Sequence, residues 1–353
     1  MKATLERRNE TQIPSWNDSA AVRGVEETAT GADRWAAVCA IAGAGVWAGI
    51  AVLARIGVAR IGAIELLFLF APLVIVPLGL ELGRVLGGGR VYELARRMQP
   101  AGAAFAVVAM VVPPGRVGGF LALGWLVVCL LVAGDGLGKL LRALSKDAGE
   151  GARATRIARA TRIAMGMAGV DLAVGGAWLV ASRLGMRPMG TQEPIGLLTA
   201  VHFHFAGFAT AMIGAAMLRF AERRGRNSWL AILVLMVAGL PFVVAAGFVI
   251  SPALKMVAAI LFSLSVAALA VCLRTLGESV EDATARILLQ VAAGAVFAGM
   301  IFSGIYAIAD YLGSDVLTIP QMSRTHGILN AVGFCLPGLL GWLVESGIRK
   351  PTH

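Results

Sequence analysis

Ten apolar stretches, most of them close to about 20 residues long, determine the environment in which this chain folds. A helix of that length crosses the hydrocarbon layer of a bilayer, where no water satisfies backbone groups. Hydrophobic residues make up 58% of the chain and charged residues only 15%, as is typical of membrane proteins with many spans. The sequence predicts an all-α transmembrane bundle of ten helices, at 35–54, 61–83, 98–113, 117–138, 163–182, 195–218, 229–250, 253–273, 287–307 and 326–346.

The distribution of Lys and Arg predicts the orientation of the bundle. With the N-terminus inside, 24 of the 31 basic residues lie in inner segments and six in outer loops. Removing one helix would spoil this alternation, which favours the third stretch although it is short and precedes Pro113-Pro114. We expect a disordered cytoplasmic tail at 1–33, a ten-helix domain at 34–347 and a cytoplasmic tail at 348–353.

The net charge and the cysteines exclude two classes of function. The formal charge is +10, but the basic residues lie in short loops, where they orient the chain and contact anionic lipids rather than nucleic acid. The four cysteines lie in apolar stretches without paired spacing, so neither a disulfide framework nor a zinc knuckle is expected. The expected partners are membrane lipids and a lipophilic small molecule.

Polar residues inside the apolar stretches are the candidates for function. An ionisable side chain at membrane depth costs a few kcal/mol, so its presence needs a reason. On the predicted topology, residues from remote segments share the outer half of the bilayer, and one acid lies nearer the middle. The outer group comprises Glu65, Gln192, Glu193, His202, His204, Asp310, Tyr311, His326 and Asn330, and the acid nearer the middle is Asp171.

This shared depth predicts one polar site beneath the outer surface. The predicted catalytic residues are His202, His204, His326, Glu65, Glu193 and Asn330, and the predicted substrate contacts are Gln192, Asp171, Asp310 and Tyr311. His326 and Asn330 are four residues apart and therefore face the same way. His202 and His204 are about 200° apart on a regular helix, so they share one site only if the helix is irregular; otherwise they serve two partners.

Some of these polar residues have a structural explanation that competes with a functional one. A single intramembrane histidine is often an interhelical hydrogen-bond donor, and this role is the alternative for His204. Glu81 and Arg84, at the inner end of the second helix, are expected to lie at the membrane interface. Lys255 begins the eighth helix, and we expect it to extend to the outer surface rather than to contact a substrate.

Three histidines with nearby acids allow three kinds of chemistry. The imidazoles of His202, His204 and His326 are suitable ligands for a divalent metal. Histidine and a buried carboxyl group also suit acid–base catalysis, and the same groups can relay protons in a transporter. The leading interpretation is a membrane enzyme that cyclises, isomerises or hydrolyses a lipophilic substrate such as an isoprenoid or polyketide-like intermediate; the alternative is a proton-coupled transporter.

Three segments carry a resemblance to a known family. IGAIELLFLFAPLVIVPLGLELG (61–83), GTQEPIGLLTAVHFHFAGF (190–208) and THGILNAVGF (325–334) together resemble the YndJ-like family of bacterial integral membrane proteins. The most specific parts are HFHFAGF and HGILNAVGF. The resemblance implies a multi-pass protein of the bacterial inner membrane and supports the candidate site, but it implies no particular reaction.

A second, local likeness concerns the HxH pair. VHFHFAGFATAMIGAA is similar to a helix of haem-copper oxidases in which two histidines bind different metal centres on opposite sides. The other elements of that family are missing, and four histidines in the chain are too few for two haems and copper. A haem is therefore a weaker expectation than a divalent metal, and a haem- or metal-binding protein without catalysis is the third interpretation.

Overall fold

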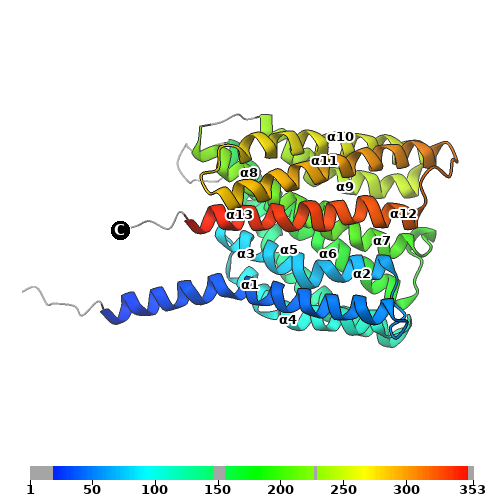
Figure 1. Ribbon diagram of the computed structural model, residues 1–353, viewed down its shortest axis with the longest axis horizontal. Helices are drawn as coiled ribbons and strands as arrows, with labels where there is room; N and C mark the ends of the chain where they lie inside the picture. The colour runs from blue at the N-terminus through cyan, green and yellow to red at the C-terminus, as the bar shows by residue number, and fades with distance from the viewer. Residues whose placement is uncertain (1–18, 146–155, 226–228, 349–353) are drawn as a thin grey trace, which may run out of the picture. The chain divides into compact units, whose positions relative to one another are not determined.

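The computed structural model describes residues 19–145, 156–225 and 229–348, with side chains from residue 34 to residue 347 within these ranges. This part of the chain consists of helices and turns, which confirms the predicted all-α bundle (Figure 1). The elements are α1 (Ser19–Arg55), α2 (Ala63–Phe70), η1 (Ala71–Ile75), α3 (Val76–Val85), α4 (Arg90–Val111), α5 (Arg116–Leu144), α6 (Arg156–Leu184), η2 (Pro188–Gly190), α7 (Ile195–His202), η3 (Phe203–Ala209), α8 (Thr210–Arg223), α9 (Trp229–Ile250), α10 (Pro252–Gly277), α11 (Ala283–Tyr311), α12 (Ile319–Met322), η4 (Ser323–Gly327), η5 (Leu329–Cys335) and α13 (Leu336–Ile348).

Residues 36–353 form one compact unit, and every contact discussed below lies within its described part. Residues 1–35 fall in a separate unit, and α1 begins at Ser19 within it; the expected tail at 1–33 stays a prediction. Residues 1–18 and 349–353, which include the rest of the two expected tails and His353, lie outside the described residues.

Nine helices in the described ranges are long and apolar enough to cross a membrane. The expected third helix is present as α4 and runs along α5, but its composition keeps it out of these nine. Its first half carries charged residues, namely Arg90, Glu93, Arg96 and Arg97. By length and composition, nine of the ten predicted spans in the described ranges qualify as membrane spans, and the tenth, α4, is more polar than the others.

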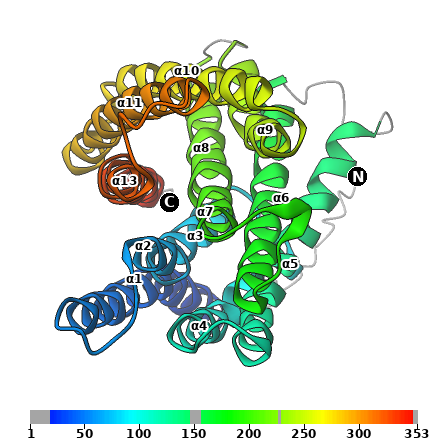
Figure 2. The same ribbon diagram turned by 90° about the vertical axis from the view of Figure 1, so that its right-hand side faces the viewer.

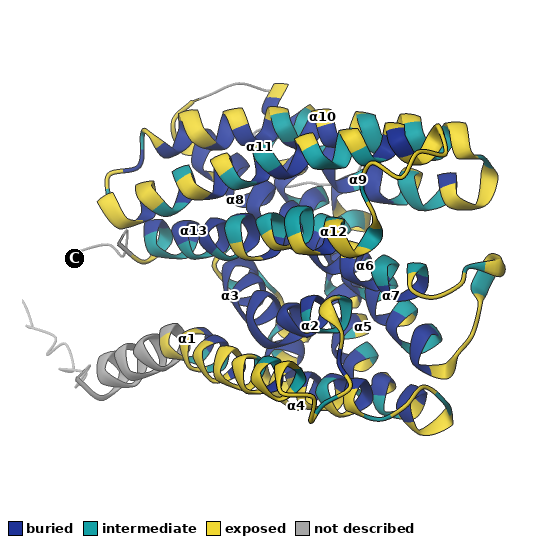
Figure 3. Ribbon diagram, turned by 45° about the vertical axis from the view of Figure 1, so that its right-hand side comes forward, coloured by how far each residue is buried: buried dark blue, intermediate teal, exposed yellow. Residues whose placement is uncertain are grey.

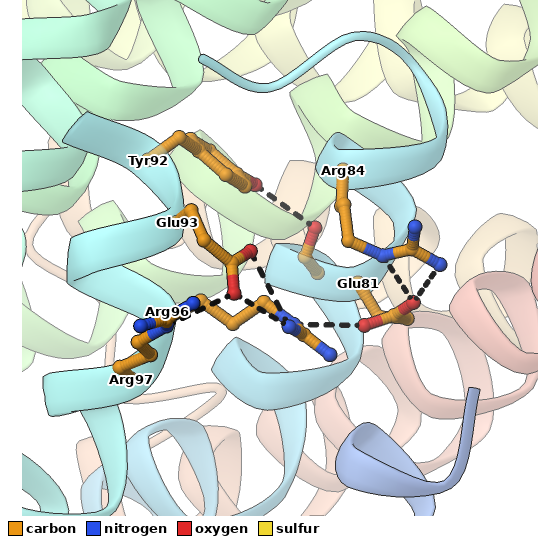
Figure 4. Close-up of polar contacts among 7 residues, drawn as sticks. Glu81, Arg84, Tyr92, Glu93, Arg96 and Arg97 are labelled. Atoms are coloured by element: carbon orange, nitrogen blue, oxygen red, sulfur yellow. Dashed lines mark hydrogen bonds and ion pairs between the residues drawn. The ribbon is translucent and has the colours of Figure 1, made fainter. Parts of the chain in front are cut away.

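The polar residues of α4 have partners inside the protein. Arg96 is buried and donates to Glu81 of α3 over 3.0 Å and to Glu93 over 3.0 Å, and Glu81 also accepts from Arg84 over 2.7 Å (Figure 4). Glu81 is 4% exposed and therefore packed inside the protein, whereas Arg84 is partly exposed; their expected depth at the membrane interface stays a prediction. A buried charge requires such pairing, and α4 supplies it.

Three of the long helices are interrupted by π-helical turns: α2–η1–α3, α7–η3–α8 and α12–η4–η5–α13. These three pack against one another through α2 with α7, α3 with α8, η1 with η3, and α13 with α3. Figure 3 shows that α3 and α8 are buried for most of their length, whereas α1 and α10 expose one face. The interrupted helices therefore form the centre of the bundle.

Proline explains the interruption in the first of them. In the π-helical turn η1, the amide of Val76 donates to the carbonyl of Ala71, five residues earlier. The next amide in this pattern belongs to Pro77, which has no N–H, so the carbonyl of Pro72 loses its helical partner. The side chain of Gln99 in α4 donates to that carbonyl over 2.6 Å. Gln99 is 2% exposed, and it ties α4 to the centre of the bundle.

Candidate functional site

A cavity of about 520 Å³ lies inside the described part of the bundle. Its walls come from α7, η3, α9, α10, α11, α12, η4 and η5, with Leu67 of α2 and Thr210 of α8. Figure 2 shows α13, α11, α10 and α9 in an arc around α7 and α8. Most of the lining is apolar. The polar residues in it are Thr199, His202, Thr210, Lys255, Ser303, Tyr306, Asp310, Ser323, His326 and Asn330.

The polar residues lie at two levels. Lys255 near the start of α10 and Asp310 near the end of α11 form an ion pair over 2.6 Å at the level of the helix ends. His202 and His326 are each seven residues from the start of α7 and α12, which is about 10 Å along a helix from those ends. The cavity therefore has charged groups at its mouth and imidazoles beneath them.

His202 is the last residue of α7 and the residue from which the π-helical turn η3 begins. Its Nδ1 lies 2.7 Å from the carbonyl oxygen of Leu198. The residue retains exposed surface inside the bundle, because it lines the cavity. The predicted candidate His202 thus faces an open space rather than a packed neighbour.

His326 reaches the same cavity from η4, more than 120 residues further along the chain. Its Nδ1 lies 2.9 Å from the carbonyl oxygen of Gly299 in α11. Asn330, one turn further, donates from Nδ2 to the carbonyl oxygen of His326 over 2.6 Å. A Cβ on Gly299 would lie 2.9 Å from Asn330 Nδ2, so glycine leaves the space that this arrangement needs.

The two cavity imidazoles have the same tautomer. A carbonyl oxygen only accepts hydrogen bonds, so the contacts with Leu198 and Gly299 assign the hydrogen to Nδ1 of His202 and His326; Nδ2 of Asn330 also lies 3.2 Å from Nδ1 of His326. In the neutral ring, Nε2 then holds the lone pair. Each neutral ring therefore offers a lone pair at Nε2.

His204 does not join them. It is 0% exposed, its Nδ1 lies 2.7 Å from the carbonyl oxygen of Ala200, and its Nε2 accepts from the indole N–H of Trp125 over 2.9 Å. Its ring also packs against Phe68 and stacks on Trp125. The HxH helix is irregular, as a shared site would need, but its two histidines still serve different partners. Both nitrogens of His204 are occupied by structural bonds.

Asp171, predicted as a substrate contact, does not line the cavity either. It is 0% exposed in α6, and both carboxyl oxygens lack a hydrogen-bond partner among the described residues. Its side chain lies against Gly207 in η3, where a Cβ would come within 2.6 Å of the Asp171 Cβ.

Glu65 of α2 and Glu193, just before α7, lie outside the lining of this cavity. Glu193 and Gln192 line a separate hollow of about 240 Å³ with the exposed turn that follows α6, and Glu193 also accepts from the amide of Leu197 over 3.2 Å. Glu65 stands in the first turn of α2. Neither carboxylate lines the cavity that holds the two imidazoles.

The mouth of the cavity contains residues that sequence reasoning assigned otherwise or missed. Asp310 lines the cavity as a predicted contact, but it is paired with Lys255, which does not simply extend to the surface. Tyr311 is 45% exposed and outside the lining, whereas Tyr306, four residues before Asp310 and therefore on the same face, lies in it. The equal depth of Lys255 and Asp310 was the signal available in the sequence.

The donor set limits what the site can hold. Within the described ranges, no three side chains of His, Cys, Asp or Glu are grouped so that they could bind a metal ion. The predicted ligand set His202, His204 and His326 is not formed, because His204 faces Trp125. The arrangement therefore offers a pair of bases in an apolar cavity.

Comparisons with known proteins agree with the motifs in the three interrupted helices. The family model described as YndJ-like protein matches residues 66–334. A relative from Bacillus subtilis (strain 168), named "Uncharacterized membrane protein YndJ", is 28% identical over 248 residues, which are 70% of this chain and 42% of the relative. The match thus spans less than half of that protein. No solved structure matches the chain.

Proposed function

The chain belongs to the YndJ-like family of multi-pass membrane proteins, and for this member we propose an acid–base enzyme that acts on a lipophilic substrate in the central cavity. Nε2 of His202 or His326 is the proposed base, and the other imidazole and Asn330 orient the reacting group. The expected location is the bacterial inner membrane with both chain ends inside, so that the cavity opens toward the outer surface.

One observation carries this proposal: two histidines from remote segments line one apolar cavity, and each is fixed through Nδ1 by a backbone carbonyl. Fixing Nδ1 sets the tautomer and holds the ring, as general-base catalysis requires. The volume of about 520 Å³ lies within the range of small-molecule sites.

The proposed step is a proton transfer. A neutral imidazole takes a proton from one atom of the substrate at Nε2, and the imidazolium returns it to another atom. The ring is neutral again at the end, so an isomerisation or cyclisation needs no further reactant. In hydrolysis, the same base would take the proton of an attacking water and return it to the leaving oxygen.

The test is conversion of lipids by purified protein in detergent. Membrane lipid extract from the source cells would be incubated with the wild type and with His202→Ala and His326→Ala, and products followed by mass spectrometry. We expect a product with the wild type and with His353→Ala, and a loss of about 100-fold or more in each cavity variant. No membrane potential is present in detergent, which separates an enzyme from a transporter.

Transport remains the competing function, and it has a distinct outcome. If folded wild type converts no lipid, but collapses a pH gradient in proteoliposomes when lipid is added, the enzyme proposal is wrong. The cavity offers little for such a path, since Asp171, the predicted midplane acid, lies outside its lining.

A further inference from the structure

The charges around the cavity indicate the class of ligand that it takes. We infer that the ligand is an electrically neutral lipophile with a hydrogen-bonding group, such as a long-chain alcohol, ketone or ester, and that fatty anions and amines are excluded. This inference rests on the proposed function, because it names the substrate class of the same cavity.

The first argument is the charge balance. Among the described residues that line the cavity, only Lys255 and Asp310 are formally charged, and their charges cancel. The two imidazoles, whose Nδ1 atoms lie at the carbonyls of Leu198 and Gly299, add no formal charge in their neutral form. A ligand with a net charge would therefore be buried without a counter-charge of its own, which is strongly unfavourable at membrane depth.

The second argument is that Lys255 and Asp310 already neutralise each other. Lys255 Nζ lies 2.6 Å from Asp310 Oδ2 and 5.0 Å from the centre of the Phe248 ring, and the two side chains are only 25% and 32% exposed. An anion that bound Lys255 would have to displace Asp310 and leave it without a partner. The same argument holds for a cation at Asp310. The pair therefore opposes both kinds of charged head group.

The third argument is the match between the remaining lining and an uncharged polar group. Below the ion pair, the polar groups are imidazole nitrogens, an amide and hydroxyls, which donate or accept single hydrogen bonds. They come from His202, His326, Asn330, Ser303, Thr199 and Thr210. Apolar side chains such as Phe205, Phe262, Val266 and Met300 make up the surrounding walls. A hydroxyl or carbonyl on a hydrocarbon chain fits both parts.

Three probes with one tail test the inference. Hexadecan-1-ol, hexadecyl sulfate and hexadecylammonium, each with a photoreactive group in the chain, would be titrated against the protein in phosphatidylcholine nanodiscs. Labelling of cavity peptides would be measured by mass spectrometry and corrected for partition into the bilayer. We expect the alcohol to bind at least tenfold more tightly than either charged probe.

Variants that remove one charge of the ion pair make the test specific. Asp310→Asn leaves Lys255 unpaired, and we expect binding of the sulfate to tighten at least tenfold. Lys255→Met leaves Asp310 unpaired, and the same gain is expected for the amine. The double variant has no charge to attract either probe and should return to a preference for the alcohol, which also shows that the single variants act through charge and not through misfolding.

The outcomes separate this inference from the proposed function. Equal or tighter binding of a charged probe by the wild type, or a ranking that the variants leave unchanged, would overturn the neutral ligand. Alcohol binding without conversion of any lipid would leave the ligand class intact and contradict the enzyme. Conversion of a charged lipid would do the reverse.

Discussion

His204 illustrates how one intramembrane histidine is used for structure. Its ring bridges the carbonyl of Ala200 and the indole of Trp125, and no exposed surface remains. His202, two residues earlier, makes a single carbonyl contact and keeps a free nitrogen at the cavity. The same residue type thus has two roles, which are decided by the partner of Nε2.

The difference predicts that two alanine substitutions change stability by different amounts. His204→Ala leaves the Trp125 N–H buried without an acceptor and opens a void, so we expect a loss of about 1 to 3 kcal/mol or more in stability. His202→Ala should change stability by less than His204→Ala, because its ring lines a space that is already open. Thermal unfolding in detergent measures both, and equal losses would argue against the separation of roles.

At the scale of elements, α11 approaches η5 closely only because Gly299 has no side chain. A Cβ there would lie 2.9 Å from Nδ2 and 3.4 Å from Cγ of Asn330. The carbonyl of the same glycine fixes the His326 ring. Gly294, on the same helix, has no atom within 4 Å of the position of a Cβ and offers a matched control.

We therefore expect Gly299→Ala to displace Asn330 and to lower lipid conversion at least tenfold, because the amide that is proposed to orient the reacting group loses its position. Gly294→Ala should leave conversion unchanged and, as an alanine in a helix, should not reduce stability. The measurement is the detergent assay with both variants at equal folded concentration. Similar activity in the two would mean that the Gly299 contact does not position the site.

The contact between α3 and α4 depends on a buried ion pair. Glu81→Leu would remove the Glu81 carboxylate from Arg96 and leave the contact with Glu93, so we expect the free energy of unfolding to fall by about 3 kcal/mol. The double variant Glu81→Leu with Arg96→Met should recover most of this loss. A substitution of Arg97, whose side chain is 77% exposed, is the control, and we expect it to change the free energy of unfolding by less than about 0.5 kcal/mol. Additive losses in the double variant would show that the pair is not coupled.

The sequence carries more information about position along a helix than about rotation around it. Apolar length and charge predict where His202, His326 and Asp310 lie along their helices, because the bilayer imposes one axis on every span. Rotation about that axis depends on packing, so Glu65 and Glu193 were expected in a site that they do not line. The π-helical turns make the rotation harder to predict, because the extra residue in such a turn changes the direction in which all later side chains of the helix point. The buried charges of α4 were also hidden, because their partner Glu81 lies on another helix.

At the scale of the whole molecule, the predicted orientation is open to a labelling test. Successive helices alternate in direction, so the turns at Ser314 and Glu278 lie at opposite ends of α11 (Figure 1). In intact cells, Ser314→Cys should react with a membrane-impermeant maleimide, whereas Glu278→Cys should react only after permeabilisation. The opposite pattern would invert the topology and turn the cavity toward the cytoplasm.

The central claim is that residues 202 and 326 face one cavity while residue 204 does not. In a variant without native cysteines, the pair His202→Cys and His326→Cys would be treated in membranes with a bifunctional thiol reagent long enough to cross the cavity. We predict an intramolecular cross-link, detected by mass spectrometry, and none for His204→Cys with His326→Cys. A cross-link in the second pair but not the first would contradict the account.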